Sequence, residues 1–100
     1  MQTPDGSIVA TLQAHEPELR AAGIRALSLF GSVARGDDRP ESDVDLVVRL
    51  DPEAHLGLFR FIALERRLGA LLGRPVQLLP EPVESPRLRA NLERDRRRVF

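Results

Sequence analysis

The sequence predicts an α/β (α+β) fold, a small mixed sheet of about three core strands with helices packed mainly on one face. Short apolar runs of strand length alternate along the chain with longer segments of helical periodicity. Glycine or proline stands at most junctions between these segments. The 100 residues suit one modest hydrophobic core, so a single domain is expected over residues 1–100.

Two helices and a strand are expected at the start of the chain. The first helix covers residues 7–15, and Pro17 opens a second that runs to residue 22 and ends at Gly23. The apolar run at 26–30 then predicts a buried strand that stops at a glycine.

The longest helix is predicted at 56–72, where leucine and phenylalanine recur on one side that should cover the sheet. Phe59 projects to the opposite side, where it is either a docking point for a partner helix or an isolated surface residue. A strand at 75–79 follows, and Ser85 caps a last helix. This helix has a basic end that either binds RNA or an acidic partner or is a solvated face: Arg94, Arg96, Arg97 and Arg98.

A Gly-Ser turn directly follows the 26–30 strand. Gly31 allows close backbone approach, and Ser32 adds a hydroxyl donor. A helical turn that starts here has unpaired N–H groups, which attract an anion such as a triphosphate. Arg35 either contacts a phosphate or packs against the loop that follows it. The turn is therefore a candidate nucleotide-binding element.

An Asp-x-Asp pair opens the next predicted strand, after a polar loop at 37–42. Asp43 and Asp45 share one face of the 43–50 strand because strand side chains alternate. Two carboxylates about 7 Å apart along one strand can hold a hard cation. Mg²⁺ suits them, because it accepts few carboxylates and fills its shell with water and phosphate oxygens.

Together these residues resemble the minimal nucleotidyltransferases of the DNA polymerase beta type superfamily. Gly31, Ser32, Asp43 and Asp45 complete the pattern G-S-x10-D-x-D, within the segments LFGSVARG and SDVDLVV. The resemblance extends from about residue 14 to the C-terminus and implies the nucleotidyltransferase fold. It also implies ATP as substrate, two Mg²⁺ ions when the enzyme is active, and catalysis by the two aspartates, with Gly31, Ser32 and Arg35 holding the nucleotide.

The chain departs from the family at the third carboxylate, which these enzymes usually carry on the next core strand. On the 75–79 strand the matching position is Gln77, which is neutral and cannot act as a general base. The missing charge should weaken binding of the second metal ion. Glu81, near the end of the strand, either substitutes for it or is an exposed loop residue.

The resemblance also implies a biological setting. Minimal nucleotidyltransferases are often encoded beside HEPN-domain proteins, and several are antitoxins that adenylylate a tyrosine of a HEPN ribonuclease toxin. The expected function is therefore adenylylation of a HEPN partner. The alternative is a non-catalytic module that neutralises this partner by binding it, which Gln77 favours. Transfer to an antibiotic or another small hydroxyl compound ranks lower, because the chain has no room for a substrate domain.

Composition narrows the possible partners, location and oligomeric state of the protein. Fifteen basic and fifteen acidic residues cancel, so no global charge attracts the protein to nucleic acid or to an anionic membrane. The chain has no cysteine, signal peptide or apolar run of bilayer length, which makes a reducing cytoplasm the expected location. A core of this size gains stability from association, so a homo- or hetero-oligomer is expected.

Overall fold

The computed structural model describes residues 4–36 and 43–100. Its strands form one four-stranded mixed sheet in the order β3-β2-β1-β4. In chain order the elements are α1 (Pro4–Ala14), α2 (Glu16–Ala21), β1 (Ile24–Phe30), α3 (Gly31–Arg35), β2 (Val44–Leu50), a 3₁₀ turn η1 (Pro52–Ala54), α4 (Leu58–Leu72), β3 (Val76–Pro80), α5 (Pro86–Asp95) and β4 (Arg97–Arg98). The predicted α/β class is confirmed. The loop predicted at 37–42 lies outside the described residues.

The sheet register is set by the two central strands. β1 pairs antiparallel with β2 and with β4, whereas β2 and β3 are parallel. Parallel neighbours need a long crossover, and α4 supplies it between β2 and β3. The register places Phe30, the last residue of β1, opposite Asp45. The end of β1 and the start of β2 therefore meet at one edge of the sheet.

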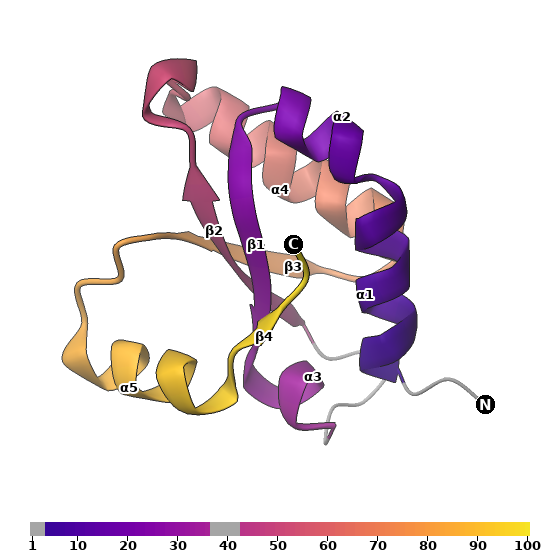
Figure 1. The fold of residues 1–100 in the computed structure, drawn as a ribbon, viewed down its shortest axis with the longest axis vertical. Coiled ribbons are helices and arrows are strands. Elements are labelled where there is room, and N and C mark those ends of the chain that lie inside the picture. The colour runs from indigo at the N-terminus through magenta and orange to yellow at the C-terminus, as the bar shows by residue number, and fades with distance from the viewer. Residues whose placement is uncertain (1–3, 37–42) are drawn as a thin grey trace.

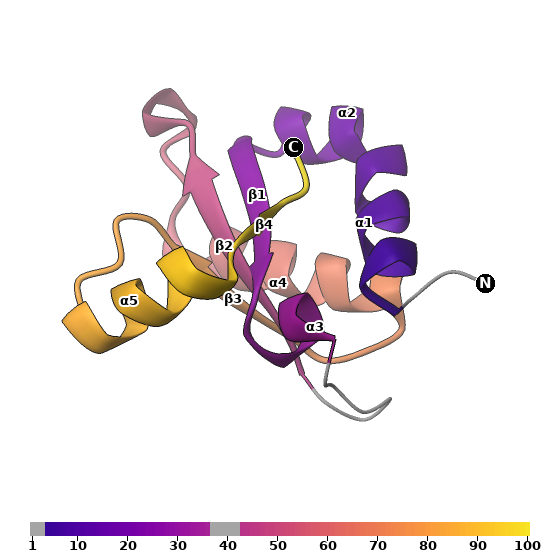
Figure 2. The ribbon, with the colours of Figure 1, turned by 60° about the horizontal axis from the view of Figure 1, so that its bottom comes forward.

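Three helices, α1, α2 and α4, cover one face of the sheet, while α5 packs on the other (Figures 1 and 2). The main core joins these three helices to the inward side chains of the strands. It contains Ile8, Leu12, Leu19, Ile24, Leu27, Leu29, Val33, Val44, Leu46, Val48, Leu64, Leu68, Leu78, Val99 and Phe100. Helices therefore lie mainly on one face, as the sequence predicts.

The second face carries a smaller apolar cluster beneath α5. Phe30, Val47 and Leu92 are buried together there, and Val83 and Leu88 pack at its border. The Ser85 hydroxyl caps α5, since Oγ accepts a hydrogen bond of 3.3 Å from the Leu88 N–H, as its position before a proline predicts.

The strand count and the end of the last helix correct the sequence prediction. The predicted basic end is only partly helical: Arg94 lies in the last turn of α5, which stops at Asp95, whereas Arg97–Arg98 form the fourth strand, β4, on the open edge of β1. Three backbone hydrogen bonds of Leu27 continue this pairing. Its N–H donates to the Phe100 carbonyl at 3.0 Å, and its carbonyl accepts from the N–H groups of Val99 at 2.8 Å and Phe100 at 3.3 Å. The pairing buries Val99 and Phe100 in the core.

The outer surface of α4 is apolar at its first turn. Phe59 is 88% exposed and Leu58 is 72% exposed. Phe59 therefore projects away from the buried side of α4, as its helical spacing predicts, while its role as a docking point stays a prediction. None of the helices in the described ranges is both long and apolar enough to cross a membrane.

Candidate active site

The Gly-Ser turn lies directly against β2, the strand that carries Asp45. Gly31 has φ +75°, a left-handed conformation that favours glycine. A Cβ on Gly31 would overlap the Asp45 oxygen Oδ2 and lie 3.3 Å from the Asp45 carboxyl carbon. The glycine is thus required twice, for its backbone angle and for the approach of Asp45. Ser32 is half-buried on the same turn.

The two aspartates lie at the start of β2, as predicted. Asp43 is exposed and immediately precedes the strand, and half-buried Asp45 is its second residue. Burial raises the pKa of Asp45, the negative charge of Asp43 raises it further, and the Arg35 guanidinium opposes both. The raised pKa thus reflects mainly the cost of burying a charged carboxylate, with a smaller contribution from the Asp43 charge. A bound cation would stabilise both carboxylates in their charged forms.

Gln77 is the neighbour of Asp45 on the adjacent strand. The parallel register pairs the two residues directly, and adjacent strands lie about 4.8 Å apart. Gln77 is exposed and offers an amide oxygen in place of a carboxylate. Within residues 4–36 and 43–100, no three His, Cys, Asp or Glu side chains gather into a cation site. The donor set on this face is therefore two carboxylates and an amide.

Arg35 is held by the last residue of α5. Its Nη1 donates to Asp95 Oδ2 at 2.9 Å, and Arg94 Nε donates to the other Asp95 oxygen at 3.1 Å. The hydrogen bond from Arg94, together with the one from Arg35, lowers the pKa of Asp95. Arg35 thus links α3 to α5 and also acts electrostatically on Asp45.

Asp95 is the residue at this site that sequence reasoning missed. It lies 60 residues from Arg35 in the chain, and no local pattern connects them. Glu81, considered above as a substitute carboxylate, instead forms an ion pair with Arg96.

Comparison with known proteins identifies the chain's relatives. The family model described as a nucleotidyltransferase domain matches residues 12–99. The protein adenylyltransferase MntA of Thermococcus cleftensis is 45% identical over 73 residues, which cover 72% of each chain.

Solved structures share the fold. One, described as a toxin-antitoxin with AMP-PNP, has a TM-score of 0.71 at 21% identity and covers 88% of this chain and 72% of that one. Another is described as tri-AMPylated Shewanella oneidensis HEPN toxin in complex with MNT antitoxin. It has a TM-score of 0.59 at 18% identity and covers 88% of this chain and 71% of that one. The family match over residues 12–99 and the 45% identity to MntA show that the chain belongs to the nucleotidyltransferase family.

Proposed function

We propose that this protein is a Mg²⁺-dependent adenylyltransferase that transfers AMP from ATP to a tyrosine of a HEPN toxin and so acts as its antitoxin. The observation that carries the proposal is the contact between the Gly31 turn and Asp45, which joins a phosphate-binding turn to a carboxylate pair. The named relative MntA and the toxin-antitoxin structures support the acceptor class. The chain contains no tyrosine, so a tyrosine acceptor must belong to another molecule.

Asp43 and Asp45 fit Mg²⁺ by their chemistry, because two carboxylate groups leave room for water and phosphate oxygens in its shell. The ion would neutralise phosphate charge and stabilise the charge that develops on the transferred group. Gln77 contributes no negative charge to a second ion. We therefore expect the second Mg²⁺ to bind more weakly than the first.

The remaining residues position the nucleotide. Gly31 and Ser32 supply a close backbone approach and a hydroxyl donor to the terminal phosphates, and Arg35 adds a positive charge. In the transfer, the acceptor oxygen forms a bond to the α-phosphorus while the bond to the departing pyrophosphate breaks. Catalysis of this kind rests mainly on positioning and charge neutralisation.

The test is transfer of α-labelled ATP to the purified HEPN partner in the presence of Mg²⁺. Wild type should label the partner, and Asp43→Asn should not. Glu53→Gln is a matched control, because it removes an exposed carboxylate on the 3₁₀ turn η1. Equal labelling by wild type and Asp43→Asn would contradict the proposal.

The second candidate function is neutralisation of the toxin by binding alone, and Gln77 is the observation that favours it. In that case the Asp43→Asn protein, without ATP, should inhibit the toxin's ribonuclease activity as well as wild type does. Loss of inhibition in this variant, together with loss of label, would support the enzymatic function instead.

A further inference from the structure

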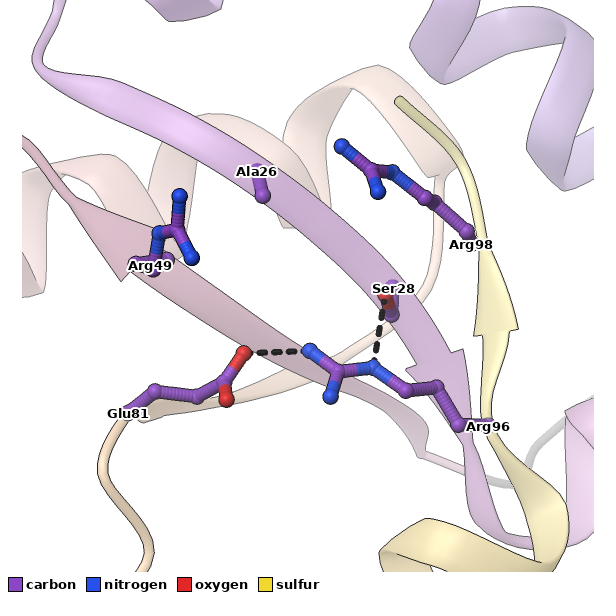
Figure 3. A pocket seen from close by; sticks show the side chains of 6 residues that line it. All are labelled: Ala26, Ser28, Arg49, Glu81, Arg96 and Arg98. Carbon is purple, nitrogen blue, oxygen red and sulfur yellow. Dashed lines mark hydrogen bonds and ion pairs between the residues drawn. The ribbon is translucent and has the colours of Figure 1, made fainter.

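A basic pocket (Figure 3) lies on the face of the sheet beneath α5. Asp45 and Arg49 share this face because strand side chains alternate, and the pocket lies at the Arg49 end of β2. Its volume is about 340 Å³. Six residues line this arginine pocket: Ala26, Ser28, Arg49, Glu81, Arg96 and Arg98. They come from all four strands or their immediate ends, and none belongs to the G-S-x10-D-x-D motif.

The sheet register builds the pocket from small and long side chains. On β1, Ala26 pairs with Arg49 of β2, and Ser28 pairs with Arg98 of β4. The central strand β1 therefore contributes two small side chains, which form the floor of the pocket. Each neighbouring strand contributes one arginine beside this floor. Since adjacent strands are about 4.8 Å apart, the backbones of β2 and β4 are separated by about 10 Å.

The third arginine is fixed in place by protein groups. Arg96 Nε donates to Ser28 Oγ at 3.2 Å, and its Nη2 pairs with Glu81 Oε1 (Figure 3). Ser28 is only 2% exposed, so this hydrogen bond anchors Arg96 to the floor. The negative charge of Glu81 is thus neutralised by Arg96.

The other two arginines, Arg49 and Arg98, contribute positive charge to the pocket. In the described part of the chain, neither Arg49 nor Arg98 has a salt-bridge partner, and Figure 3 shows both guanidinium groups at the pocket without an ion pair to its other residues. With Glu81 balanced by Arg96, the pocket has an excess of two positive charges. Such a surface attracts an anion with charge on more than one side.

We propose that the arginine pocket binds a phosphate group at a site separate from the candidate active site. A tetrahedral phosphate presents oxygens toward both arginines at once, whereas a carboxylate presents its two oxygens along one edge. The hydroxyl of Ser28 can add a donor from the floor.

The separation from the active site follows from strand geometry. Arg49 lies four residues after Asp45 on β2, which is about 13 Å along the strand. Between them, Val47 is covered by Leu92 of α5. The phosphate held at Arg49 and Arg98 is thus distinct from those expected at the Gly-Ser turn.

The test is a titration of the metal-free protein with inorganic phosphate, followed by the NMR signals of the arginine Nε–H groups and the β1 amides. Ionic strength is held constant with chloride, because salt screens exposed charges. The signals of Arg49, Arg98 and Ser28 should shift and saturate. The Arg49→Gln/Arg98→Gln variant should bind phosphate at least about ten-fold more weakly.

The matched control is Arg66→Gln/Arg87→Gln, which removes the same charge from exposed positions on α4 and α5. It should change phosphate affinity less than about two-fold. The single variant Arg49→Gln tests the pocket without altering β4. Shifts of equal size in wild type and Arg49→Gln, or equal effects of chloride and phosphate, would overturn the proposal.

A parallel titration with AMP identifies the source of the phosphate. Tighter binding of AMP than of inorganic phosphate, with the same residues shifting, means that the pocket takes a nucleotide phosphate. Equal affinities mean that it takes phosphate as such. Since neither metal, ATP nor HEPN partner is present, this experiment succeeds or fails independently of the adenylyltransferase assay.

Discussion

The two ends of the sheet face beneath α5 carry opposite charge, although the same strands build both. Asp45, Val47 and Arg49 follow one another on one side of β2. At the first end, Asp45 is next to Asp43 and an uncharged Gln77, so negative charge accumulates. At the second end, Arg49 is joined by two further arginines. A nearly neutral protein can thus offer a cation site and an anion site on one surface, provided that something separates them.

The apolar cluster under α5 lies between the two ends and is formed by Phe30, Val47 and Leu92. This cluster covers the sheet between the two ends, which lie about 13 Å apart along β2, so a single phosphate group cannot contact both. In the two proposals above, a cation binds at the acidic end and a phosphate group at the basic end.

The largest effect is expected at the acidic end from Gly31→Ala. The substitution forces a side chain into the left-handed region and into the Asp45 carboxylate, and a displacement of about 1 Å at a reacting centre can cost about 100-fold in rate. Adenylyl transfer should fall by at least that factor. Gly36→Ala is the matched control, because Gly36 has φ +78° but nothing within 4 Å of its Cβ position.

Both variants should lose about 1–2 kcal/mol of unfolding free energy from backbone strain, measured by urea denaturation. Only Gly31→Ala should also lose transfer activity, whereas phosphate binding in the arginine pocket should persist in both. Equal activity losses in the two variants would mean that the contact with Asp45 has no part in transfer.

The second prediction concerns the apolar cluster under α5. Leu92→Ala should lower the free energy of unfolding by about 2–4 kcal/mol, because Leu92 is buried on the sheet. Phe59→Ala should change it by less than about 0.5 kcal/mol, since Phe59 is exposed. Thermal and urea denaturation measure both. A small effect of Leu92→Ala would show that packing of α5 on the sheet contributes little to stability.

The third prediction strengthens the acidic end. Gln77→Asp places a carboxylate beside Asp45, so Mg²⁺ affinity should rise about ten-fold by isothermal titration calorimetry. Gln77→Asn keeps the position neutral and should leave the affinity within about two-fold of wild type. A rise in transfer activity with Gln77→Asp would mean that the natural glutamine limits the enzyme. An unchanged Mg²⁺ affinity would mean that residue 77 does not reach the ion.

The smallest effect concerns the pKa of Asp45. Because the folded protein raises this pKa, ionisation of Asp45 lowers the free energy of unfolding as the pH rises from the unfolded to the folded pKa. Asp43→Asn removes one cause of the shift, so the pKa of Asp45 should fall toward its ordinary value. Carboxyl ¹³C NMR titration of the metal-free protein measures it. A pKa that stays in place would assign the whole shift to burial.

Features built from neighbouring residues could be predicted from the sequence. The Gly31 turn, the aspartates on one strand face and the Ser85 cap each depend on a few consecutive residues, and the structure has all three in place. The placement of Gln77 near the carboxylate pair came from the family resemblance, and the parallel register of β2 and β3 sets it opposite Asp45.

Features built from distant residues could not be predicted. The basic C-terminus has no strand pattern of its own, and it becomes β4 because β1 offers an open edge and the core accepts Val99 and Phe100. The Arg35–Asp95 ion pair and the arginine pocket also join segments that meet only in the folded chain. A count of charges shows neutrality, and only the fold shows where each sign gathers.

Residues at the end of α5 contact both the candidate active site and the arginine pocket. Asp95 and Arg96 are consecutive, and the first holds Arg35 while the second holds Ser28 and Glu81. A single peptide unit therefore connects the guanidinium that acts on Asp45 with the one that frames the pocket. This unit carries both the partner of Arg35 and Arg96 itself, so the acidic edge and the arginine pocket share one structural support.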